Sequence, residues 1–98
     1  MSLIGEIIAE EAWICVATDG EKQLVYHYLT NLLGANRNDY ILAYPCSAYP
    51  YIGYDTEKKH IQTYDEPSPE DTIYTFKDFL NAIIDLNQYI EPDTGGLL

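Results

Sequence analysis

The sequence predicts an α+β domain in which an antiparallel sheet of four to five strands carries two helices packed on one face, in the order β-α-β-β-β-(β)-α. Two observations predict this class. Residues 38–64 contain three short runs rich in aromatic and β-branched residues, which suit a pleated surface. Residues 18–33 and 76–89 place apolar residues at helical spacing, and such a stripe needs a sheet face on which to be buried.

The N-terminal third predicts a strand followed by a helix. Residues 1–11 form an N-terminal arm or a short helix, because apolar residues recur at helical spacing but a glycine interrupts them. Residues 12–17 are almost continuously apolar, as in a central strand. Thr18 and Glu21 have the spacing of a capping box, and Gly34 suits the end of the helix that follows. The expected apolar stripe of this helix is Leu24, Val25, Tyr28, Leu29 and Leu32.

The middle of the chain predicts three successive strands, at residues 40–44, 51–54 and 60–64. Pro45 and Pro50 bracket the segment between the first two runs, so that segment cannot be the interior of a central strand. The polar link between the last two runs is short enough for a hairpin loop. Short links favour antiparallel neighbours.

The last third predicts a short strand and a second helix. Residues 65–71 are acidic, contain two prolines and predict an exposed loop. A short final strand follows at residues 72–74. Thr75 and Asp78 then have the spacing of a second N-terminal cap, which opens a helix over residues 76–89.

The length of 98 residues predicts a single domain with one core, covering residues 1–98. Residues 91–98 contain a proline and two glycines and are expected to form an irregular tail. No apolar run approaches the roughly 20 residues of a membrane helix, and no secretory signal opens the chain. We therefore expect a cytoplasmic protein in which Cys15 and Cys46 are reduced thiols.

The charge of the chain is strongly acidic. Sixteen acidic and five basic residues give a formal net charge of −11. Direct nucleic-acid binding is disfavoured, because contacts with phosphates need clustered lysine and arginine. An acidic surface steers a protein towards basic partners at a rate that falls with ionic strength. Two alternatives stay open: the acidic residues imitate the phosphates of a nucleic acid in the groove of another protein, or they only keep the surface solvated.

The sequence contains no arrangement that predicts catalysis or metal binding. In an antiparallel meander, Cys46 and His60 fall about a strand length apart, roughly 15 Å, which is too far for a catalytic pair. His27 is expected on an exposed helix face and Cys15 in the core. Metal-binding spacings of cysteine and histidine are absent, and the acidic loop lacks the pattern of a calcium loop. We therefore expect no enzyme, no cofactor and no metal.

Tyrosine is concentrated in the middle of the chain, where residues 40–74 contain seven of the ten tyrosines. A sheet of this size cannot bury all of them, and tyrosine is common in recognition surfaces. Alternation places Tyr51 and Gly53 on one face of their strand and Ile52 and Tyr54 on the other. Ordinary cross-strand packing is the alternative interpretation. The residues expected to contact a partner are Tyr40, Tyr44, Tyr49, Tyr51, Tyr54, Asp65, Glu66, Glu70 and Asp71.

Four short segments carry a resemblance to a group of known proteins. They are the opening strand at residues 13–17, Leu33-Gly34 at a helix end, Tyr51-Ile52-Gly53-Tyr54, and Thr75-Phe76-Lys77-Asp78-Phe79-Leu80. Over residues 12–84 the chain resembles small, uncharacterised phage-encoded accessory proteins with the order β-α-β-β-β-α. The resemblance implies a virus-like accessory protein in a host cytoplasm, and it implies no catalytic residue.

These observations together predict a small, acidic, non-enzymatic protein-interaction module. It would bind a host or partner protein, as a nucleic-acid-mimicking inhibitor in one version, or a second copy of itself as a homodimer. The alternatives are a structural domain without a specific site and a small enzyme or ligand binder near Cys46 and Tyr49.

Overall fold

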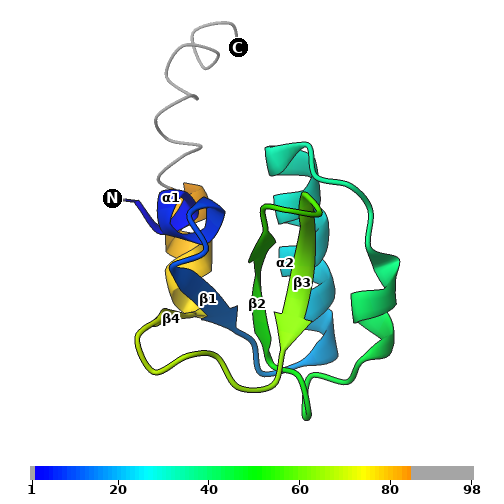
Figure 1. The fold of residues 1–98 in the computed structure, drawn as a ribbon. Coiled ribbons are helices and arrows are strands. Elements are labelled where there is room, and N and C mark those ends of the chain that lie inside the picture. Colours follow the sequence, from blue (N-terminus) through cyan, green and yellow to red (C-terminus); the bar gives the residue numbers. More distant parts are fainter. Residues whose placement is uncertain (1, 85–98) are drawn as a thin grey trace, which may run out of the picture.

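The fold is described from a computed structural model, for residues 2–84 of the chain (Figure 1). It is an α+β fold with a four-stranded sheet, which confirms the predicted class. The elements are α1 (Leu3–Ile8), β1 (Ala12–Cys15), α2 (Asp19–Leu33), the 3₁₀ helix η1 (Asp39–Ala43), β2 (Tyr51–Asp55), β3 (His60–Tyr64), β4 (Thr72–Thr75) and a helix over residues 76–84. The predicted end of the last helix and the tail at 91–98 lie outside the described residues.

The sheet has the strand order β3-β2-β1-β4. β2 and β3 form the predicted antiparallel hairpin, in which Asp55 pairs with His60, and β1 pairs antiparallel with β2. The fourth pairing differs from the prediction of a wholly antiparallel sheet, because β4 runs parallel to β1. The reason is the course of residues 65–71, which carry the chain from the end of β3 back to the start of β1, so that β4 enters the sheet in the direction of β1.

The predicted strand at residues 40–44 is wrong. This segment forms η1, outside the sheet. Tyr26 of α2 fixes the start of the segment, since its hydroxyl accepts a hydrogen bond from the Asn38 amide (2.6 Å) and donates one to Asp39 Oδ1 (2.8 Å). Lys22 Nζ holds the other end by donating to the carbonyl oxygen of Tyr44 (2.9 Å). Side chains of a distant helix therefore satisfy groups that a strand would have paired with a neighbour.

Both predicted helix caps are confirmed. Thr18 Oγ1 accepts from the Glu21 amide (3.1 Å), and Thr75 and Asp78 cap each other's amides at 2.9 and 3.1 Å. Gly34 ends α2 in the left-handed region, with φ of +62°, which a residue with a Cβ adopts at a cost. The first segment is a helix, α1, whose N-terminal cap is Ser2.

The buried stripe of α2 is rotated from the predicted one. Leu24 and Leu32 are 45% and 40% exposed. The buried residues of the helix are Lys22, Val25, Tyr26, Leu29 and Thr30. Hydrophobicity alone placed the stripe, whereas a lysine and a tyrosine are buried here because their polar ends find partners in the loop beside them.

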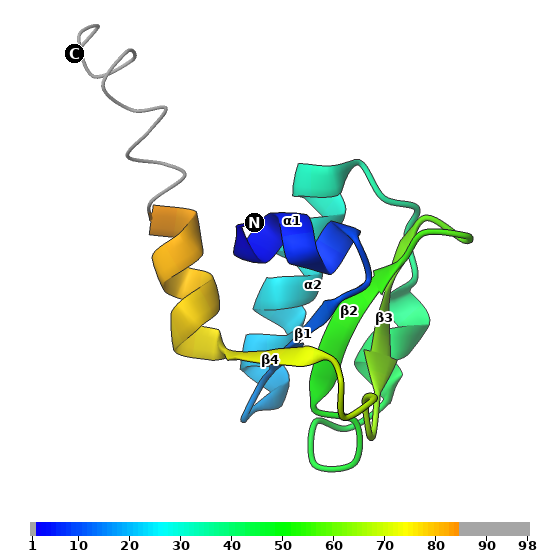
Figure 2. The same ribbon diagram turned by 60° about the vertical axis from the view of Figure 1, so that its left-hand side comes forward.

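The α-helices of residues 2–84, namely α1, α2 and the 76–84 helix, lie on one side of the sheet, as Figure 2 shows. Ile14, Ile52 and Ile61 of the three adjoining strands point to that side, and they form one core with residues of α1, α2 and the 76–84 helix. The opposite side of the sheet, here called the open face, carries no helix of residues 2–84. Strand pairing and alternation place on it Trp13, Cys15, Tyr51, Gly53, Asp55, His60, Gln62, Tyr64, Ile73 and Thr75. No helix of residues 2–84 has the length and apolar character needed to cross a membrane.

Candidate binding surface

Trp13 lies at the centre of the open face. Its ring covers Gly53 of the neighbouring strand so closely that a Cβ on residue 53 would lie 2.6 Å from the ring. The ring stacks against Tyr64 with centroids 5.1 Å apart and planes inclined by 24°. Its Nε1 donates to Asp71 Oδ2 at 2.8 Å. The indole is therefore held by one neighbouring strand, one aromatic ring and the acidic loop.

A second aromatic pair continues this surface beyond the sheet. Tyr44 and Tyr49 lie on the loop that leads into β2, and the centroids of their rings are 5.1 Å apart. Lys22 positions this loop, because its buried ammonium donates to the carbonyl oxygens of both tyrosines, at 2.9 and 3.0 Å. Burial lowers the pKa of Lys22, while nearby Cys46 and Asp19 act in the opposite direction.

Tyr64 connects the Trp13–Tyr64 pair with the Tyr44–Tyr49 pair, because it lines a hollow on each of its sides. One hollow, of about 360 Å³, lies between Tyr64 and the Tyr44–Tyr49 pair. The other, of about 320 Å³, lies beside Trp13. The four residues Trp13, Tyr44, Tyr49 and Tyr64 thus form one continuous surface, here called the aromatic strip. Tyr64 is its most accessible member in the sheet, with 47% of its surface exposed.

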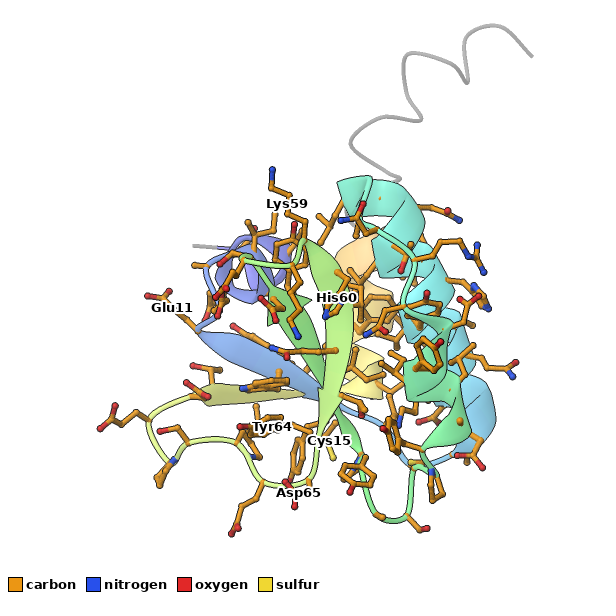
Figure 3. All side chains as sticks on the ribbon, turned by 45° about the vertical axis from the view of Figure 1, so that its right-hand side comes forward. Glu11, Cys15, Lys59, His60, Tyr64 and Asp65 are labelled. Carbon is orange, nitrogen blue, oxygen red and sulfur yellow. The ribbon has the colours of Figure 1, made fainter. Side chains whose placement is uncertain are left out.

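Carboxylates border the aromatic strip. Asp65 lines the first hollow, and Glu10 and Asp71 line the second. Glu10 is held in place by the amide and hydroxyl of Thr56, whose amide donates at 2.9 Å. Within residues 2–84, neither hollow is lined by a lysine or an arginine. Figure 3 shows Tyr64 and Cys15 towards one end of the open face, with Asp65 and Glu11 at its borders and His60 farther along β3. The surface is therefore suited to positively charged groups.

Several predicted partner-binding residues come together at this surface. Tyr44, Tyr49 and Asp65 line the first hollow, Asp71 binds the Trp13 indole, and Tyr51 lies on the open face between Cys15 and Tyr64.

Other predicted residues lie elsewhere. Tyr40 is 82% exposed on η1, next to the Arg37–Asp39 ion pair and outside both hollows. Tyr54 belongs to the opposite face, where it packs against the core, although it also contributes to the lining of the hollow beside Trp13. Glu66 and Glu70 are exposed on the loop.

Trp13 and Tyr64 were not among the predicted site residues. Alternation along β1 contained a signal for Trp13, since Ala12 and Ile14 point to the core and an intervening bulky residue must point the other way. The pairing that brings Tyr64 to Trp13 depends on how three strands are ordered, which the residue pattern does not show.

The cysteines and histidines occupy separate places. Cys46 is buried, its thiol donates to the Val16 carbonyl oxygen at 3.0 Å, and burial raises its pKa, so the reactive thiolate is disfavoured. The Nε2 atom of His60 lies 3.9 Å from Oδ2 of Asp55. Cys15 was expected in the core but is half-buried on the open face, because it alternates with Ile14. Both cysteines are free thiols.

A larger hollow, of about 710 Å³, lies in the helix layer between α1, the end of α2 and the 76–84 helix. Leu3, Ile4 and Leu32 form much of its apolar lining. Asn81 and Ala82 also line it, so it adjoins the end of the described part of the chain.

Comparisons of the chain with protein-family models, with curated proteins and with solved structures found no match.

Proposed function

We propose that this protein is a small non-enzymatic interaction module that binds a basic partner protein through the aromatic strip and its carboxylate border. The observation that carries the proposal is the position of Tyr64. It is 47% exposed, stacks on Trp13, and separates two hollows that are bordered by Asp65 and Asp71.

The aromatic strip has the properties of a binding hot spot. Tryptophan, tyrosine and arginine dominate the energetics of protein interfaces, and the large rings of tryptophan and tyrosine lose little entropy when they are buried. Trp13 is already fixed by Gly53 and Asp71 before any partner arrives. A surface that is ordered in advance binds at a lower entropic cost.

The charge of the surface favours a partner that presents lysine or arginine. The chain has a net charge of −11, and carboxylates line both hollows. An arginine side chain can stack on the ring of Tyr64 or Trp13 while it pairs with Asp65 or Asp71. Self-association through this surface is disfavoured, because it would bring the carboxylates of two acidic copies together.

A nucleic-acid-binding protein is the version of this partner that the acidity fits best, because its groove presents lysine and arginine in the spacing of phosphates. From the resemblance of residues 12–84 to phage-encoded accessory proteins, we further propose that the partner is a host protein and that binding takes place in a cytoplasm. A catalytic function near Cys46 is less well supported, because that thiol is buried and its pKa is raised.

Affinity capture with matched variants tests the proposal. The wild-type chain, Tyr64→Ala and Tyr40→Ala are immobilised, and retained proteins are eluted with a salt gradient and identified. Tyr40 is the control, because it is 82% exposed but lies outside the aromatic strip. The partner is then purified, and its affinity for the three chains is measured by calorimetry.

We expect a partner with a positive net charge that binds the wild type and Tyr40→Ala equally and binds Tyr64→Ala about 30-fold more weakly. The affinity should fall steeply with salt. Equal affinities for Tyr64→Ala and the wild type would show that the aromatic strip is not the binding surface.

A further inference from the structure

The two edges of the sheet differ. The outer edge of β3 is covered by residues 36–38: the Asn36 amide donates to the Lys59 carbonyl oxygen (2.7 Å), and Asn38 Nδ2 donates to the Ile61 carbonyl oxygen (3.0 Å). At the other edge, β4 pairs only with β1 among the described residues. Figure 2 views the sheet from this side and shows no helix, strand or loop of residues 2–84 lying across β4.

The hydrogen bonds of β4 show which of its backbone groups are unused. The Thr72 amide donates to the Glu11 carbonyl oxygen at 3.0 Å, so Thr72 faces β1. In a parallel pair every second residue bonds to the neighbour, so Tyr74 also faces β1 and the N–H and C=O of Ile73 point outward. The Thr75 amide is taken by Asp78 Oδ2 at 2.9 Å. Within residues 2–84, the N–H and C=O of Ile73 therefore have no hydrogen-bond partner at this edge.

We propose that an extended basic segment of the partner adds to β4 as a fifth strand of the sheet. This inference rests on the proposed function and names the mode of binding. Addition of a strand to an exposed sheet edge takes its affinity from main-chain hydrogen bonds and its specificity from alternate side chains. Ile73 would supply the hydrogen bonds, and the residue is 42% exposed, with its side chain on the open face.

The register connects this edge with the aromatic strip. Ile73 pairs with Trp13, so an added strand would lie next to Ile73 with every second side chain directed over the open face. A long basic side chain from that strand would be directed over the open face towards the Asp71 carboxylate, which accepts a hydrogen bond from the Trp13 indole. One partner segment would thus contact the β4 edge and the carboxylate border of the aromatic strip.

The charges around β4 select a basic segment rather than a second copy of this chain. Glu70 and Asp71 directly precede the strand, Asp78 caps its end, and Glu11 lies beside its start. Lys77 is the base that follows the strand in sequence. Antiparallel pairing of two β4 strands would bring the Glu70–Asp71 end of each copy beside the Asp78 end of the other, whereas a lysine-bearing segment would neutralise these carboxylates.

Amide hydrogen exchange measured by NMR tests this arrangement directly. The probe is a capped octapeptide that alternates lysine and valine. Two comparison peptides have the same sequence, one N-methylated on all lysines and the other N-methylated on all valines. In the free protein, the Thr72 and Tyr74 amides should exchange slowly and the Ile73 amide quickly. Saturating probe should slow exchange at Ile73 by about tenfold or more, because its N–H gains an acceptor. The peptide methylated on the residues that face β4 should have no such effect.

Two variants separate the backbone from the side chain. Ile73→Pro removes the outward N–H, which an edge strand tolerates, and Ile73→Val keeps it. We expect Ile73→Pro to bind the probe about five- to tenfold more weakly and Ile73→Val to bind it as the wild type does. Far-ultraviolet circular dichroism checks the fold of each variant, and the N-methylated peptides carry the test if Ile73→Pro does not fold.

The outcomes for the edge and for the aromatic strip are distinct. Partner binding that depends on Tyr64, with unchanged exchange at Ile73 and full binding to Ile73→Pro, would overturn strand addition and leave the proposed function standing. Protection of the Ile73 amide by the probe, with a partner affinity that does not depend on Tyr64, would support strand addition at β4 and overturn the role of the aromatic strip in binding. An Ile73 amide that the probe never protects would overturn strand addition.

Discussion

The ring of Trp13 lies against the Cα of Gly53, on the neighbouring strand of the sheet, with room for a hydrogen atom and not for a methyl group. A Cβ at residue 53 would lie 2.6 and 2.8 Å from two ring carbons of Trp13. This contact lets the indole lie flat on the open face, where Tyr64 stacks on it.

Gly53→Ala should displace the indole. We expect a loss of about 1–3 kcal/mol in the free energy of unfolding, because the ring must move away from a buried backbone. Trp13 is the single tryptophan, so a shift of its fluorescence reports the movement. Gly20→Ala is the control: a Cβ there meets its nearest atom at 3.8 Å, and alanine should leave stability equal or raise it by up to about 1 kcal/mol. Equal effects of the two changes would contradict the packing described here.

Lys22 stabilises the loop that carries Tyr44 and Tyr49, because its buried ammonium donates to both carbonyl oxygens. Lys22→Met keeps the length of the side chain but leaves these carbonyls without a donor. We expect the variant to lose about 2 kcal/mol in chemical denaturation. Lys77→Met, at an exposed position, should change stability by no more than about 0.5 kcal/mol. A stability of Lys22→Met equal to that of the wild type would show that other donors serve the loop.

Tyr26 makes stability depend on alkaline pH. Burial raises the pKa of its phenol above the ordinary value of 10.0. An acid whose pKa is raised by folding contributes stability that is full below the unfolded pKa and is lost as the pH rises through the folded pKa. Tyr74, which donates to Glu6, shifts in the same direction, so the wild type should weaken above about pH 10.

Tyr26→Phe isolates the contribution of this phenol. The variant should lose about 1–2 kcal/mol at neutral pH, since the Asn38 amide and Asp39 lose their partner. The difference between wild type and variant should shrink above pH 10, which urea denaturation at several pH values measures. A difference that is the same at pH 8 and pH 11 would exclude a titrating Tyr26.

Asp39 governs the acid side. Hydrogen bonds from Tyr26, and then from Arg37, hold the pKa of its carboxyl below the ordinary value of 3.8. Its contribution is therefore present above pH 3.8 and is lost as the pH falls through the lower, folded pKa. Asp39→Asn should be less stable than the wild type at pH 6, and the two curves should converge below pH 3. Curves that stay parallel down to pH 2 would rule out this assignment.

The two cysteines should react at very different rates. Cys15 is half-buried on the open face, whereas Cys46 is buried and donates to the Val16 carbonyl oxygen, with a raised pKa. A disulfide reagent should modify Cys15 in the native protein and Cys46 only after unfolding. Cys15 lies on the open face between Tyr51 of β2 and Thr75 of β4. A group attached to Cys15 should therefore also weaken partner binding. The Cys15→Ser variant serves as the control, and rapid modification of that variant would show that Cys46 is accessible.

Local chemistry in the sequence determined the elements whose stabilising contacts lie within a few residues. Thr18 with Glu21, Thr75 with Asp78, and the left-handed Gly34 are such cases, and the β2–β3 hairpin is another. The short strand β4 was also predicted from the sequence. The placement of the helices on one face was predicted too, because their amphipathic stripes must be buried together.

The tertiary structure alone decided what contacts between distant residues control. A strand-like pattern at residues 40–44 became a 3₁₀ helix because Tyr26 and Lys22 bind its ends. The direction of β4 was decided by the path of the acidic loop, and the aromatic strip by Trp13, which binds Asp71 across 58 positions of sequence. Propensity and periodicity describe a residue and its near neighbours, whereas these features depend on which strands become adjacent, and that is settled only when the whole core is packed.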